Sequence, residues 1–166
     1  MALDINGHMM TATFDDLLAA LSARTGLPLA DNDGVCAFCI DDRPVSIQFD
    51  EESERVVVTA LVANDLPANP SRQLVIDLLN LGFGMVYDGL PAVGRDPDLG
   101  FITAFLIFSG ARLNAAEFPD EFEKFVAFAL NLAKRIDSER EGGALELPAE
   151  NAAPGDAPAS PGFLRV

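Results

Sequence analysis

The stretch Pro70 to Gly82, PSRQLVIDLLNLG, decides how we interpret the rest of the chain. Asn69 or Ser71 can cap its start and Gly82 provides a stop, so the pattern predicts a helix over 70–82. Its apolar residues fall into two adjacent rows, whereas a surface helix of a small domain needs only one apolar stripe. We therefore expect a helix covered on two sides, by its own domain and by a second copy of the chain. The rows are Leu74, Leu78 and Leu81, and beside them Val75, Leu79 and Gly82.

The residues before this stretch predict one helix and three strands. Thr13 and Asp16 have capping-box spacing, and apolar residues recur with the helical period until Gly26, which predicts a helix over 13–25. Strand-like segments follow at 35–40, 45–49 and 55–62. The short acidic turns between them indicate an antiparallel meander, because parallel crossovers need a dozen residues or more.

The residues after it predict a second part of the sheet and a long helix. Short extended pieces are expected at 85–87 and 91–93, and the strongest strand of the chain at 101–108, FITAFLIF. Asn114 then caps a helix that ends near Arg140, with Pro119 in its first turn or after a short lead-in. The order of one helix, three strands, a helix, one or two strands and a helix predicts an α+β fold, a twisted antiparallel sheet packed with helices. With two strands in the second part, the order is α-β-β-β-α-β-β-α.

The domain limits follow from composition. We expect residues 1–10 to be a flexible leader or a cloning scar, 11–141 to be one domain, and 142–166, rich in Gly, Pro and Ala, to be a disordered tail. A length of 166 residues is enough to bury a core.

The charge restricts the partners. The chain has 26 Asp and Glu against 11 Lys and Arg, a net charge of −15 at pH 7. Such a surface repels phosphate backbones and anionic lipid, which argues against nucleic-acid and membrane-surface binding. No apolar run reaches the roughly 20 residues that cross a bilayer, and the N-terminus lacks a signal-peptide pattern. We therefore expect a cytoplasmic protein.

The CxxC formed by Cys36 and Cys39 predicts no metal or redox site. It lies in a strand, where residues three apart point to opposite faces, and the single histidine, His8, lies in the leader. A structural zinc site therefore lacks ligands. We expect two buried structural cysteines.

Nothing in the sequence indicates catalysis. A nucleophile needs a neighbouring base, and His8 is the only histidine. The glycines between 82 and 100 match neither GxGxxG nor a P-loop, and the paired carboxylates fit solvated turns. We expect no cofactor, no metal and no enzyme activity, with an acidic site around Asp96 and Asp98 as a minor alternative.

Three stretches resemble the class I type III secretion chaperones, the Tir chaperone-like family. They are FDDLLAALSARTGLPL from Phe14, LPAVGRDPDLGFITAFLIF from Leu90, and LNAAEFPDEFEKFVAFALNLAKRI from Leu113. The resemblance implies a homodimer with helix 70–82 near its two-fold axis, which binds the N-terminal segment of a secreted effector in extended form and keeps it secretion-competent.

Carried onto this chain, the resemblance implies two sets of site residues. The dimer interface would contain Leu74, Leu78, Leu81 and Phe83. The effector-binding surface would contain Leu18, Leu21, Val45, Ile47 and Phe49, the last three on the wetter face of the middle strand. The alternative function is a dimeric α+β adaptor or regulatory protein-binding domain that has no role in secretion.

Overall fold

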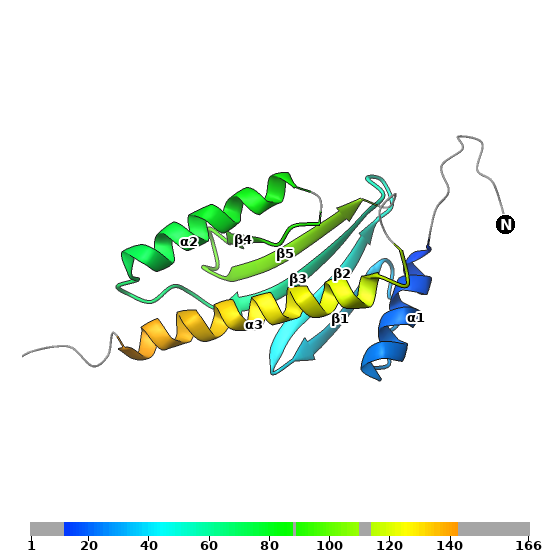
Figure 1. The fold of residues 1–166 in the computed structure, drawn as a ribbon, viewed down its shortest axis with the longest axis horizontal. Coiled ribbons are helices and arrows are strands. Elements are labelled where there is room, and N and C mark those ends of the chain that lie inside the picture. Colours follow the sequence, from blue (N-terminus) through cyan, green and yellow to red (C-terminus); the bar gives the residue numbers. More distant parts are fainter. Residues whose placement is uncertain (1–11, 88, 110–113, 143–166) are drawn as a thin grey trace, which may run out of the picture.

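Five antiparallel strands form one sheet in the computed structural model, which describes residues 12–87, 89–109 and 114–142 (Figure 1). The strands lie in the order β1-β2-β3-β5-β4, so the chain returns to place β5 between β3 and β4. The strands are β1 (Val35–Ile40), β2 (Arg43–Asp50), β3 (Arg55–Ala63), β4 (Ala92–Arg95) and β5 (Ile102–Ser109). The helices are α1 (Phe14–Thr25), α2 (Arg72–Gly82), the 3₁₀ turn η1 (Phe83–Val86) and α3 (Phe118–Gly142). The α+β class and the element order expected from the sequence are confirmed.

Helix α1 begins at the capping box that the sequence indicated. The Thr13 hydroxyl accepts a hydrogen bond from the Asp16 amide at 3.2 Å, and the Asp16 carboxylate accepts one from the Thr13 amide at 3.0 Å. Gly26 ends the helix with a left-handed φ of 73°, a conformation that favours glycine.

Helices α1 and α3 cover one face of the sheet (Figure 1). Phe14 of α1 stacks on Phe49 of β2 with ring centroids 5.9 Å apart, and Phe122 of α3 lies 6.0 Å from Phe38 of β1. In register across the sheet, Ile47 pairs with Val58 and Val58 with Leu106, and all three are buried. Alternate residues of the central strands thus form the core.

Helix α2 begins one residue after Ser71, whose hydroxyl accepts a hydrogen bond from the Leu74 amide at 3.1 Å. Helix α2 ends at Gly82 as expected, but Gly82 keeps a right-handed helical conformation and the chain continues directly as η1. The extended piece expected at 85–87 is therefore mostly a 3₁₀ turn. A tight turn fits here because Gly84 packs on the Pro91 carbonyl, where a Cβ would lie only 2.2 Å away.

Helix α3 is preceded by the short lead-in that Pro119 allowed. Asn114 accepts from the Ala116 amide through its side chain, at 3.0 Å, and from the Phe118 amide through its carbonyl, at 2.9 Å. The helix proper then runs from Phe118 to Gly142. The expected leader and nearly all of the expected tail lie outside the described residues.

Candidate protein-binding site

The face of the sheet opposite α1 and α3, which we call the outer face, is apolar but not buried. Its side chains on β1 are exposed, and those on β3 and β5 are half-buried. A shallow hollow of about 540 Å³ lies over the end of this face near Leu61 and Phe101. Hydrophobic side chains left in this state typically mark an interaction surface. The outer face includes Val35, Ala37 and Cys39 on β1, Pro44, Ser46 and Gln48 on β2, Val57, Thr59 and Leu61 on β3, and Thr103, Phe105 and Ile107 on β5.

Acidic turns lie at both ends of β2, which runs along this face. The Asp41–Asp42 turn precedes the strand and the Asp50–Glu54 turn follows it. In the second turn the Asp50 carboxylate accepts hydrogen bonds from the Ser53 hydroxyl at 2.5 Å and the Glu52 amide at 3.1 Å. These two bonds lower the pKa of Asp50. The carboxylates therefore shape the turns and give the apolar face an acidic rim.

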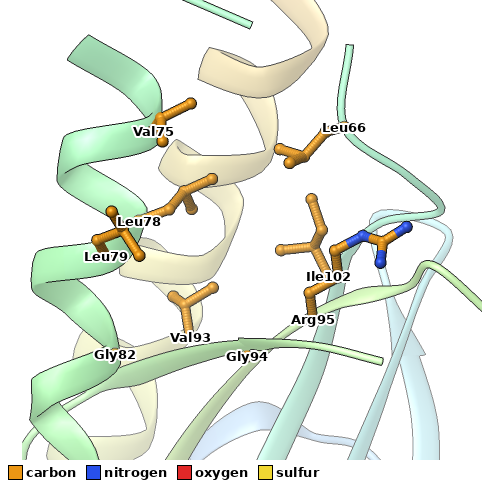
Figure 2. Close-up of a pocket in the computed structure, with 9 residues that line it drawn as sticks. All are labelled: Leu66, Val75, Leu78, Leu79, Gly82, Val93, Gly94, Arg95 and Ile102. Carbon is orange, nitrogen blue, oxygen red and sulfur yellow. The ribbon is translucent and has the colours of Figure 1, made fainter. Parts of the chain in front are cut away.

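Helix α2 carries a second exposed apolar surface. Its outward side, which we call the outer row, contains Leu79, with 68% of its surface exposed, and Val75, with 37%. Phe83 follows in η1 and is 71% exposed. Between α2 and β4 lies an apolar groove of about 280 Å³, with Arg95 as its charged residue (Figure 2). The groove is lined by Leu66, Val75, Leu78, Leu79, Gly82, Val93, Gly94, Arg95 and Ile102.

The four residues expected at a dimer interface differ in how far they are buried in their own chain. Leu74 is fully buried in the core of its own chain, and Leu78 and Leu81 are half-buried against that core. Phe83 alone of the four is largely exposed. The helix is thus apolar on two sides, but the row of Leu74, Leu78 and Leu81 faces inward and the row containing Val75 and Leu79 faces outward.

The residues expected to bind an effector lie on the covered face of the sheet. Leu18 and Leu21 are buried on α1, and Val45 and Ile47 are buried on β2. Phe49, half-buried, stacks on Phe14. The expectation that the three β2 residues lie on the wetter face is wrong, because α1 and α3 cover the side to which they point. Ser46 and Gln48 occupy the opposite side.

The outer-face residues of β3 and β5 were missed by sequence reasoning. Both strands are apolar at almost every position, so the alternation that marks a half-covered strand is lacking. Val57 and Val58 differ in burial although they are the same residue type. The one signal available was that a strand apolar on both faces needs a cover on each, and the helices supply only one.

The two cysteines point to opposite faces, as expected from their spacing, and both are free thiols. Cys36 is buried, and this burial raises the pKa of its thiol. Cys39 is exposed on the outer face, so the expectation that both are buried is wrong for Cys39. The physical reason is the strand period of two combined with a sheet covered on one side. Within the described residues no group of three or more His, Cys, Asp or Glu is placed to hold a metal ion.

A family model described as the Tir chaperone protein (CesT) family matches residues 16–133, more than half of the chain. The chain belongs to the Tir chaperone protein family. The resemblance noted in the sequence is thereby confirmed, and the matched residues run from α1 into α3. A comparison with curated proteins found no match.

Solved structures share the fold of this Tir chaperone family member. A chain of the HopA1–SchA chaperone–effector complex aligns with a TM-score of 0.59 and 20% identity, covering 73% of this chain and 93% of that chain. A chain of the ExsC–ExsE complex gives 0.58 and 20%, covering 76% and 96%. The Yersinia pestis type III secretion chaperone SycH, solved with a stable fragment of YscM2, gives 0.56 and 18%, covering 72% and 99%. Among the described residues of this family member, no helix is long and apolar enough to cross a membrane.

Proposed function

We propose that this chain is a cytoplasmic type III secretion chaperone. It binds the N-terminal segment of a secreted effector in extended form and keeps that segment soluble and secretion-competent. It acts by binding alone, with no cofactor and no catalysis of its own. The observation that carries the proposal is the apolar outer face of the sheet, left uncovered in a member of a chaperone family.

The chemistry of the outer face defines the segment that it accepts. Val57, Leu61 and Phe105 are half-buried, and they lose contact with water when apolar side chains of a bound segment pack on them. Each Å² of apolar surface removed from water contributes about 25 cal/mol of favourable binding free energy. The Ser46 and Thr59 hydroxyls, 2.7 Å apart, satisfy one another within this surface. The acidic turns beside it attract basic residues that flank the apolar ones. An effector segment with spaced apolar residues and basic neighbours fits both features.

We further propose that the chaperone is a homodimer joined through α2. The outer row and Phe83 supply an apolar surface that a second copy of the same helix matches by two-fold symmetry. Leu78 and Leu81, half-buried beneath this row, support it from the core side. The dimer places two outer faces in one assembly, so that a single extended segment reaches both.

The effector surface is tested by placing a charge in it. Leu61→Glu puts a carboxylate beside the hollow of the outer face, whereas Asn131→Glu adds the same charge at an exposed position of α3, on the other side of the sheet. Each variant is co-expressed with N-terminal segments of proteins secreted by the same cell, and the soluble complex is measured after purification. We expect Leu61→Glu to lose the complex and Asn131→Glu to retain it. Thermal unfolding of each variant alone checks that the fold persists.

Two outcomes contradict the proposal. Retention of the complex by Leu61→Glu places the segment elsewhere than on the outer face. Recovery of resident cytoplasmic proteins only, with no secreted segment bound by the wild-type chain, favours a dimeric adaptor over a secretion chaperone.

A further inference from the structure

Apolar packing holds α2 at few points. Leu74 is the fully buried residue of this helix, and Leu78 and Leu81 are only half-buried. In Figure 2 the groove separates Leu78 and Leu79 on the helix from Leu66 and Ile102 on the body of the domain. By contrast α1, a helix of similar length, buries four residues. The position of α2 therefore depends on other contacts besides the packing of its apolar side on the core.

The last turns of α3 supply such contacts. The Arg135 guanidinium pairs with the Asp77 carboxylate of α2 at 2.6 Å. The Glu139 carboxylate accepts hydrogen bonds from the Ser71 amide at 2.8 Å and from the Ser71 hydroxyl at 2.6 Å. Since the same hydroxyl caps α2 through the Leu74 amide, Glu139 holds the capping side chain in place. The pKa of Asp77 and of Glu139 is lowered by these bonds.

The loop that leads into α2 is fixed from the same end of α3. Arg140 donates a hydrogen bond to the Asp65 carbonyl at 2.6 Å. The Asp65 carboxylate lies 3.4 Å from the Arg95 guanidinium, which lines the groove. The contacting residues of α3 all lie beyond residue 133, where the match to the family model ends. These contacts therefore come from residues outside the segment that matches the family model.

We propose that residues 135–140 of α3 form a clamp, in which Arg135 and Glu139 are positioning residues that set the orientation of α2 and hold its outer row outward. The clamp contacts three places along the chain: the loop at Asp65, the cap at Ser71 and the polar side of the helix at Asp77. Its effect on dimerisation rests on the homodimer proposed above, whereas the clamp itself is a property of one chain.

Amide hydrogen exchange of the full chain tests the clamp directly. The variant Arg135→Ala/Glu139→Ala removes one positively charged and one negatively charged side chain that contact α2 and its cap. The matched control, Lys134→Ala/Glu141→Ala, removes the same two charges from exposed positions of α3 that make no hydrogen bond or ion pair with the described residues. We expect exchange of the amides of residues 75–82 to become roughly tenfold faster in the first variant, since local opening is governed by local contacts. The control should leave these rates unchanged, and both variants should leave β3 and β5 unchanged.

Equal exchange of α2 in the variant and the control overturns the clamp. So does an equal acceleration in β3 and β5, because that result would mean a general loss of stability.

Swapping the charges of Arg135 and Asp77 provides the second test. Arg135→Asp alone places two carboxylates side by side and should accelerate exchange of α2, and adding Asp77→Arg should restore part of the protection. Simple additivity of the two substitutions overturns a direct pairing. Light scattering on the wild type separates the two proposals: a strict monomer at micromolar concentration overturns the dimer, while the exchange rates still decide the clamp.

Discussion

Single residues of β3 illustrate how sharply burial changes along one strand. Val58 has no exposed surface, whereas Val57, of the same type, is half-buried on the outer face. The sequence predicts that neighbours in a strand face opposite sides, but it does not identify the covered side when both are apolar. The helices decide this, because α1 and α3 pack on the side of Val58. Sequence reasoning therefore assigned Val45, Ile47 and Phe49 to the wetter side of β2, which is the covered side, while the strand itself was predicted correctly.

At the same scale, the capping box of α1 allows a quantitative prediction. We expect Thr13→Ala to lower the free energy of unfolding by about 1 kcal/mol, because the Asp16 amide loses its acceptor. Thr13→Ser, which keeps the hydroxyl, should change it little. Urea unfolding at pH 7 measures both, and equal stability of the alanine variant and the wild type would contradict the role of the cap.

The pH dependence of this cap has a definite sign. Hydrogen bonds from the Thr13 amide and hydroxyl lower the pKa of Asp16 below its ordinary value of 3.8. The carboxylate therefore stabilises the fold above pH 3.8, and this contribution is lost as the pH falls through the lowered value. The stability difference between wild type and Thr13→Ala should accordingly narrow in that acidic range and stay constant between pH 5 and pH 8.

At the scale of elements, α2 shows what periodicity can and cannot predict. The helix, its capping serine and its two apolar rows were all predictable from local sequence. The orientation of the rows was not, since it depends on Asp77 meeting Arg135 and on Ser71 meeting Glu139, residues far apart in the chain. For the same reason the continuation into η1 was not predicted, because it depends on how Gly84 packs against Pro91.

The outer row leads to a prediction for the proposed dimer. Leu79→Glu places an unpaired carboxylate in the proposed dimer interface, the seam between the two copies of α2. The dissociation constant of the dimer should rise on the order of a hundredfold, because burying an unpaired charge is costly. Asn80→Glu adds the same charge on the polar side of α2 and should have a much smaller effect. Analytical ultracentrifugation over a concentration series measures both constants. A dimer unaffected by Leu79→Glu would show that the seam lies away from this row.

At the scale of the whole molecule, element order and charge were the most predictable properties. Turn lengths led to the meander of β1, β2 and β3, and the net charge of −15 argued against nucleic-acid partners. The order of the remaining strands was not predictable, because β5 pairs with both β3 and β4 through long-range contacts. A chain with this charge and two apolar surfaces combines self-repulsion, which limits aggregation, with places where a partner can bind.

The two thiols of β1 have a practical consequence. Cys36 lies beneath the helices and Cys39 lies on the opposite side of the same strand, so one element carries two reporters of different events. In a timed alkylation experiment followed by mass spectrometry, we expect Cys39 to react in the folded protein and Cys36 only when the domain opens. A ligand seated over β1 should slow the first reaction, whereas a ligand that stabilises the fold from any site should slow the second. The native chain thus measures occupancy and unfolding separately, without an introduced label.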